Sequence, residues 1–219
     1  MHSGRLCDMM SEPGKRIRGG MTGLVLLTVC MLVLASWGGA SPACAQGLYH
    51  IDQRVGAIEF TVQHLGLWSS HGMFDRFIGE LIIDPAHPTE TKIKVDVDAS
   101  SISMPWDQAA AMLRSADFFD VGEYPSIKFT STAVQQLAPD RFRIQGKLRI
   151  RGITHDQTLD AHLLDLHSDA AHGRQLADFV VSGNLHRTDY GMVADEGFIS
   201  DQVEISIHAR IVLDHSRSG

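Results

Sequence analysis

Apolar and polar residues alternate along most of the chain after residue 57, which is the pattern of half-buried β-strands. The polar stretch from Ser168 to Gln175 interrupts the pattern, and we expect it to form a loop. About eight strands joined mostly by short turns predict one antiparallel sheet that curls and closes, because closure removes exposed edges. The alternating runs cover residues 58–64, 72–83, 93–101, 127–134, 142–150, 153–166, 179–185 and 203–213.

The inward parity changes once, within the second of these runs. Phe74 and Phe77 belong to stretches of opposite parity, so one extra residue must lie between them. We therefore expect a bulge or a sharp bend near Asp75 and Arg76. Glycines inside strands, such as Gly79, Gly146 and Gly183, suit the bends of a small barrel.

One stretch has helical rather than strand periodicity. Between Asp107 and Phe119, apolar residues recur three and four positions apart, and Gly122 and Pro125 then stop any helix. We expect a short amphipathic helix that buries its apolar face against one end of the barrel. Two roles remain open for it: a lid that gates the interior, or a connector that fills core.

The first 45 residues have the order of a cleavable secretory signal. A basic segment at 15–18 precedes the apolar run 23–35, and small residues follow up to Ala45. We expect cleavage after Ala45 and export to the periplasm, which leaves one folded domain over residues 46–219. An uncleaved anchor is an alternative, although a membrane helix needs about 20 apolar residues. Lipid attachment at Cys44 is another.

The cysteine positions and the net charge exclude several kinds of site and partner for the mature domain. Cys7, Cys30 and Cys44 all precede the expected cleavage site, so no disulfide, thiolate metal site or cysteine nucleophile is expected beyond it. The formal net charge of the full chain is −7, and loss of a basic leader makes it more negative. Such a protein is a poor candidate for nucleic acid or for an anionic membrane surface. The sequence does not decide between a monomer and a homodimer.

His64 is the polar residue that stands out in the expected interior. It shares its parity with Ile58, Phe60 and Val62, so all four should face inward. A buried imidazole needs a hydrogen-bond partner, which is either the polar group of a bound ligand or a neighbour such as Ser70. An eight-stranded barrel is compatible with both, because it can be filled by side chains or can hold one slender ligand.

Aromatic and charged residues offer further candidates. Phe118 and Phe119 are the best lid residues, while Arg187 and Tyr190 stand where a strand ends and are either a polar rim or an ordinary surface group. Phenylalanines that line or fill the interior are Phe60, Phe74, Phe77, Phe129, Phe142 and Phe179.

Metal binding and catalysis have weak support. His162, His167 and His172 recur every five residues, which places them on neither a strand face nor a helix face. Ser69, Ser70, His71 and Asp75 include residue types that hydrolases use, but no nucleophile elbow surrounds the serines. We expect neither a metal site nor a catalytic residue.

Several short motifs occur in a fixed order along the chain. They are Phe60-x-Val62-x-His64, Gly72-x-Phe74-x-x-Phe77-x-Gly79, Val97 to Ile102, Leu113 to Asp120, Tyr124-Pro125-x-Ile127-x-Phe129, Gly146 to Thr154, and Arg187-x-Asp189-Tyr190-Gly191. From Tyr49 to Leu213, their order and spacing resemble the YceI-like family of exported lipid-binding proteins. Two departures are Tyr49, where the family often has Trp, and Tyr190, where it often has Phe. A third is the segment 108–112, which replaces an Arg-Asp pair of the family.

The resemblance implies an all-β, lipocalin-like, extended eight-stranded antiparallel barrel with one short capping helix. It also implies an apolar pore for a polyisoprenoid, an isoprenoid quinone or a fatty-acyl chain, with no other cofactor and only transient membrane contact for loading. Two other functions stay open: an enzyme acting on a lipid-like substrate in the same cavity, and a ligand-free stress or structural protein. The expected ligand-binding residues are Ile58, Phe60, Val62, His64, Phe74, Phe77, Phe118, Phe119, Phe129, Arg187 and Tyr190.

Overall fold

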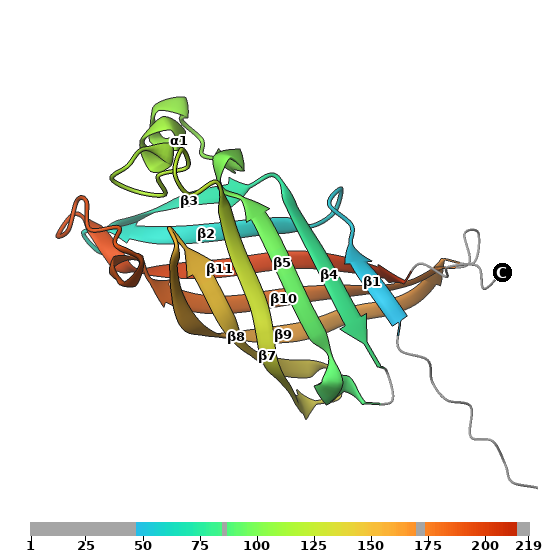
Figure 1. Ribbon diagram of the computed structural model, residues 1–219. Coiled ribbons are helices and arrows are strands. Elements are labelled where there is room, and N and C mark those ends of the chain that lie inside the picture. The colour runs from blue at the N-terminus through green and yellow to red at the C-terminus, as the bar shows by residue number, and fades with distance from the viewer. Residues whose placement is uncertain (1–46, 85–86, 170–173, 214–219) are drawn as a thin grey trace, which may run out of the picture. The chain divides into compact units, whose positions relative to one another are not determined.

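A computed structural model describes residues 47–84, 87–169 and 174–213. The expected leader, with its cleavage site and Cys44, lies outside these residues. Among the described residues, no helix has the length and apolar character to cross a membrane. Strands dominate this described part of the chain, and its single α-helix, α1 (Asp107–Arg114), lies at one end of the sheet (Figure 1). The strands are β1 (Gly47–Ile51), β2 (Ala57–His64), β3 (Trp68–Phe74), β4 (Phe77–Ile83), β5 (Lys92–Asp98), β6 (Ile102–Ser103), β7 (Ser126–Ala138), β8 (Arg141–Ile150), β9 (Ile153–Asp169), β10 (Arg174–His186) and β11 (Ile199–Leu213).

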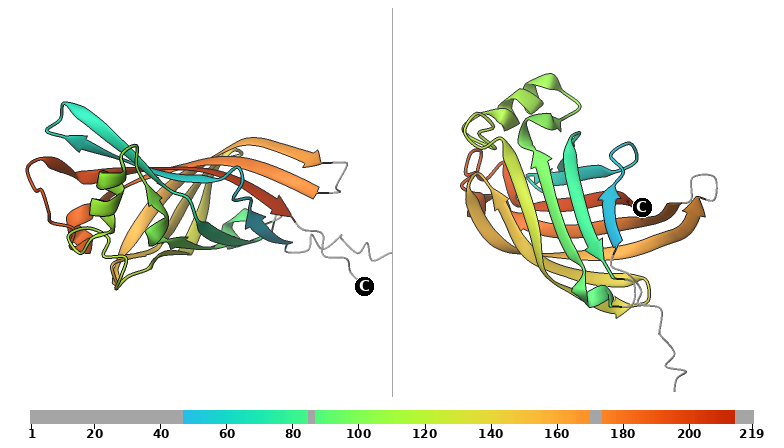
Figure 2. Two further views of the ribbon diagram at one scale, coloured as in Figure 1. Left: turned by 90° about the horizontal axis from the view of Figure 1, so that it is seen from above. Right: turned by 45° about the vertical axis from the view of Figure 1, so that its right-hand side comes forward.

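The sheet is antiparallel and closes into the predicted eight-stranded barrel. The ring runs β1-β4-β5-β7-β8-β9-β10-β11 and returns to β1, because β1 pairs with both β4 and β11. β2 and β3 continue the lines of β1 and β4 along β11 and toward α1, and β6 pairs with β3. β6 likewise continues the line of β5, so three of the eight lines in the ring are broken, at β1/β2, β4/β3 and β5/β6. Figure 2 shows the curled sheet from two further sides.

The predicted break in the second strand is present. β3 ends at Phe74 and β4 begins at Phe77, and both phenylalanines are buried despite their opposite parity. The backbone N–H of Asp75 donates to the Ser101 carbonyl at 3.2 Å, and that of Arg76 donates to Ser101 Oγ at 3.1 Å. The bend is thus held by the 3-10 turn Ala99–Ser101, which lies between β5 and β6.

The helix is shorter than predicted, and this expectation was wrong at its C-terminal end. α1 stops at Arg114 instead of Phe119, because Ser115 adopts an extended backbone and its hydroxyl donates to the Met112 carbonyl at 2.7 Å. Phe118 and Phe119 consequently lie in the turns that follow α1.

The predicted loop at 168–175 was also wrong at its edges. β9 extends to Asp169 and β10 starts at Arg174, with Ser168 opposite Gln175. Backbone pairing continues past the point where the side-chain pattern becomes polar, and the partly buried side chains of Arg174 and Asp169 pair across the two strands at 3.3 Å.

We call the end of the barrel that carries α1, the β2–β3 turn and the 3-10 turn Arg187–Tyr190 the α1 end, and the opposite one the far end. The main buried cluster lies in the α1 half of the barrel and includes Phe74, Phe129, Leu148 and Val181. A smaller cluster at the far end consists of Tyr49, Leu81, Ala177 and Ile211. Residues of both clusters line one cavity inside the barrel.

Candidate functional site: an apolar channel

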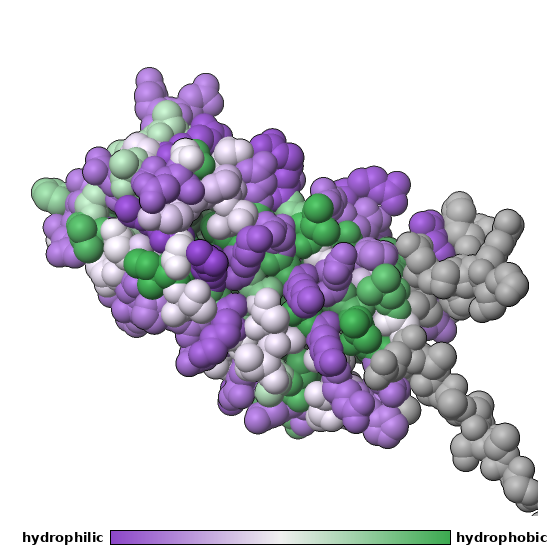
Figure 3. Space-filling model, viewed as in Figure 1, coloured by the Kyte–Doolittle hydropathy of each residue, from purple (hydrophilic) through white to green (hydrophobic). Residues whose placement is uncertain are grey.

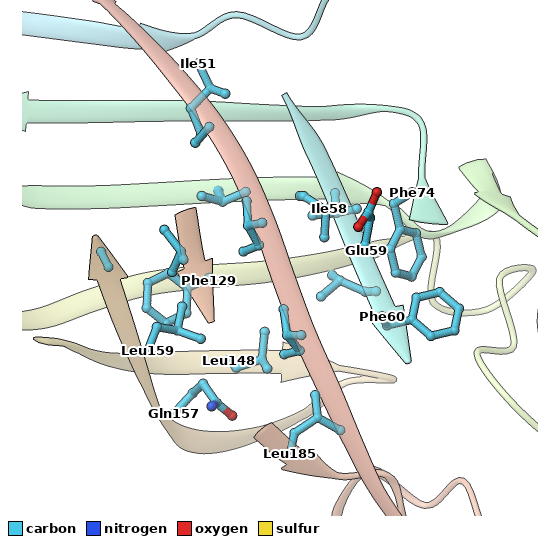
Figure 4. A pocket seen from close by; sticks show the side chains of 18 of the residues that line it. Ile51, Ile58, Glu59, Phe60, Phe74, Phe129, Leu148, Gln157, Leu159 and Leu185 are labelled. Carbon is cyan, nitrogen blue, oxygen red and sulfur yellow. The ribbon is translucent and has the colours of Figure 1, made fainter. Parts of the chain in front are cut away.

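The barrel encloses a cavity of about 550 Å³ whose wall is nearly all apolar (Figure 4). Along β10 alone, lining residues extend from Gln175 at the far end to Leu185 near α1, which is about 30 Å of strand. Every ring strand contributes, because inward positions of successive strands alternate with outward ones. A long and slender apolar chain matches such a space.

Inward glycines make room for large side chains from the neighbouring strands. A Cβ at Gly72 would lie 2.3 Å from Cζ of Phe60, and a Cβ at Gly146 would lie 2.4 Å from Cζ of Phe129. The rings lie over these glycines and thereby shape the wall of the channel. Close approach, in addition to bending, therefore accounts for glycines inside the strands.

Nine of the eleven residues expected to contact a ligand line the channel, and two do not. Phe77 is buried, but its ring packs toward Gly56, where a Cβ would lie 2.9 Å from Cζ of Phe77. Tyr190 is buried edge-on against His155, with ring centroids 5.2 Å apart, and burial raises the pKa of its phenol to about 12. The nine are Ile58, Phe60, Val62, His64, Phe74, Phe118, Phe119, Phe129 and Arg187.

His64 lies on the channel wall at the α1 end. Its Nε2 is 2.8 Å from Ser70 Oγ, and its ring stacks on Trp68 at a centroid distance of 5.7 Å. The partner expected for a core histidine is thus present. Nδ1 has no hydrogen-bond partner among the described residues, so His64 can still offer one polar atom to a ligand.

Arg187 is no surface residue, because only 3 % of it is exposed. Its Nε donates to the Ser200 carbonyl at 3.1 Å, and its Nη1 and Nη2 donate to the carbonyls of Met192, Ala194 and Ile199. The guanidinium therefore ties the segment that precedes β11 to the end of β10. Within the described residues, no carboxylate pairs with this cation, which also lines the channel.

Apolar side chains are exposed around the α1 end. The turn between β2 and β3 carries Leu67, which is 77 % exposed, and the N–H of Leu65 donates to the Phe198 carbonyl at 3.0 Å. Trp106, at the start of α1, is exposed and also lines the channel. Figure 3 shows such hydrophobic residues among polar ones at the end where β2, β3 and α1 lie.

Sequence reasoning missed several lining residues. Met104 and Met112 flank the α1 end, and their signal was weak because they lie in or beside the helix rather than in a strand. Gln157 is a buried polar residue on the wall, and its parity matches that of Leu159 and Ala161. That parity was a usable signal for an inward amide.

A group of Asp165, His167 and Asp178 has the residue types of a cation site. Both carboxylate oxygens of Asp178 accept hydrogen bonds from Arg210, at 2.7 and 2.8 Å. Nδ1 of His167 lies 3.1 Å from Asp165. Since a dication would have to displace the Arg210 guanidinium, we assign no metal to this group; His172 lies outside the described residues.

The sequence of the chain matches that of a known protein family. The model of the YceI-like domain matches residues 49–211. The chain belongs to the YceI-like family. Protein YceI of Salmonella arizonae is 32% identical over 150 residues, which cover 68% of this chain and 78% of the relative.

Solved structures of YceI-like and related proteins share the fold. Burkholderia cenocepacia BcnA superposes with a TM-score of 0.66 at 18% identity, covering 73% of this chain and 98% of that one. The Campylobacter jejuni YceI protein gives 0.57 at 22% identity, covering 68% and 88%. A polyisoprenoid binding domain from Saccharophagus degradans, implicated in plant cell wall breakdown, gives 0.54 at 16% identity, covering 76% and 98%.

Proposed function

We propose that this YceI-like protein binds one long apolar lipid, such as a polyisoprenoid, an isoprenoid quinone or a fatty-acyl chain, along the barrel axis. The observation that carries the proposal is the continuous apolar channel of about 550 Å³. Each methylene removed from water contributes about 0.8 kcal/mol, so a long chain binds firmly with few polar contacts. Ordering of the chain offsets part of this gain. The polyisoprenoid binding domain of Saccharophagus degradans, which shares the fold, is consistent with this ligand class.

Blocking the channel tests the proposal. Val181 lies on the channel wall in the middle of β10, whereas its neighbour Val180 is absent from the wall. Val181→Trp should abolish lipid uptake, and Val180→Trp should preserve it. Native mass spectrometry of protein purified from its own cells, followed by solvent extraction, measures both. An unliganded wild type that takes up no added lipid would overturn the proposal.

We propose further that the protein works in the periplasm as a carrier or store and contacts membranes only while lipid is loaded. The signal-like order of residues 1–45 supports export, and the exposed side chains of Leu65, Leu67 and Phe198 support a contact beside the channel. Cell fractionation combined with the intact mass tests export. A chain that begins at Gln46 is expected, and a cytoplasmic chain with its leader intact would contradict it.

A second candidate function rests on one observation, the 2.8 Å contact between His64 Nε2 and Ser70 Oγ on the channel wall. A serine beside a histidine base is the core of many hydrolytic sites. Among the described residues, no third side chain orients His64 through Nδ1, and we therefore favour binding over catalysis. Long-chain esters offered to wild type and to Ser70→Ala should be hydrolysed by neither; hydrolysis lost only in the variant would favour the enzyme.

A further inference from the structure

The ladder between β9 and β10 stops before either strand ends. Its last pair toward the α1 end is Ser182 with Asp160, although β9 starts at Ile153 and β10 continues to His186. Beyond that pair β9 still pairs with β8 and β10 with β11, but carbonyls that face the gap between β9 and β10 have no ladder donor. Two of them, on Thr158 and Asn184, need donors from elsewhere.

The side chain of Gln157 supplies both donors. Its Nε2 donates to the Thr158 carbonyl at 2.9 Å and to the Asn184 carbonyl at 3.0 Å. This fixes the orientation of the amide, because the flipped form would place Oε1 against two carbonyl oxygens. Both amide hydrogens are thereby used within the protein.

Oε1 of Gln157 is left as an acceptor on the channel wall. The residue is only 7 % exposed, and no donor within the described residues reaches Oε1. Figure 4 shows the amide among apolar lining side chains that include Leu148, Leu159 and Leu185. Oε1 keeps some accessible surface and faces a channel whose wall is nearly all apolar, so the site favours a ligand that brings a donor.

We propose that Gln157 Oε1 accepts a hydrogen bond from a hydroxyl group of the bound lipid, so that the channel selects lipid alcohols over ethers and ionised carboxylates. This rests on the proposed lipid binding. Ethers and carboxylates have only acceptors and would meet Oε1 with like partial charge. Gln157 lies four residues beyond the start of β9, or about 13 Å of strand, so the hydroxyl end lies inside the barrel and not at its rim.

A competition between two ligands of equal length tests this site. Purified mature protein is mixed with equimolar geranylgeraniol and geranylgeranyl methyl ether, and native mass spectrometry gives the ratio of the two complexes. Wild type should prefer the alcohol by about tenfold, the worth of one buried hydrogen bond. Gln157→Met should bind both equally. Gln175→Met, which alters the other lining glutamine at the far end, should keep the wild-type ratio.

Each remaining outcome has one meaning. Equal binding of both probes by wild type overturns the hydroxyl site and leaves lipid binding intact, and this comparison needs no variant to fold. A preference that survives in Gln157→Met also overturns the site. Binding of neither probe, together with no uptake of any longer lipid, overturns the proposed function itself.

Discussion

The ring of Phe129 covers the backbone of Gly146 on the neighbouring strand, so that a Cβ at residue 146 would lie 2.4 Å from Cζ and 2.6 Å from the Thr130 carbonyl oxygen. Gly146→Ala should therefore lower the free energy of unfolding by about 1–3 kcal/mol through overpacking. Urea denaturation of wild type and variant measures this change in the free energy of unfolding. Gly122→Ala is the matched control, because nothing lies within 4 Å of its Cβ, and it should change stability by less than about 0.5 kcal/mol.

Arg187 should be more important for stability than any exposed arginine. Arg187→Met leaves one buried and three partly buried carbonyls without their donor, and we expect the free energy of unfolding to fall by about 3 kcal/mol. Arg187→Lys should recover only part of the lost stability, because an ammonium group cannot reproduce the planar fork of donors in the guanidinium. Arg54→Ala, at an 80% exposed side chain, should be nearly neutral in the same denaturation experiment. Equal losses at both sites would contradict the structural role.

Acid should weaken the pair formed by Asp178 and Arg210. The hydrogen bonds from Arg210 lower the pKa of the Asp178 carboxyl. The stability that the ionised carboxyl contributes is fully present above its pKa in the unfolded chain, which is about 3.9. It is lost as the pH falls through the lower pKa of the folded protein. Asp178→Asn should thus cost about 1 kcal/mol at pH 7 and less at pH 3. A cost that stays constant with pH would exclude this linkage.

Arg114 should control how fast the channel exchanges the proposed lipid ligand. It links the last turn of α1 to the neighbouring strand end, donating from Nε to the Ser100 carbonyl at 3.0 Å and from Nη2 to the Ile102 carbonyl. Arg114→Ala should loosen α1 and speed release of a prebound fluorescent lipid by about tenfold. Asp117→Ala, at an exposed residue just after α1, serves as the control. Unchanged release from Arg114→Ala would argue that α1 is a fixed connector.

Alternation predicted most of the barrel because inward and outward positions follow parity. It even located the bend between Phe74 and Phe77, where the parity changes. Strand β1 was not among the eight predicted strands, since five residues, GLYHI, are too few to show a period. β1 closes the ring by pairing with β4, up to Ile83, and with β11, up to Leu213. The local sequence pattern does not show these distant partners.

The inward residues of the candidate site could be predicted from the sequence in the same way. Parity placed Ile58, Phe60, Val62 and His64 on the channel wall, where the structure has them. It could not separate Phe77, which packs toward Gly56, from Phe74, which reaches the channel, because both are inward and buried. That distinction depends on which neighbouring strand leaves space, and this is a property of tertiary packing.

The pairing of β1 with β11 joins the two ends of the described chain, Tyr49 opposite Leu213. A ring closed in this way has its decisive contact between residues of very large sequence separation. Such a topology folds slowly, since the chain must pay the full loop-closure entropy before the last ladder forms. A fragment that lacks β11 cannot complete the barrel wall, so the closed channel forms only after β11, the last strand of the chain, has paired.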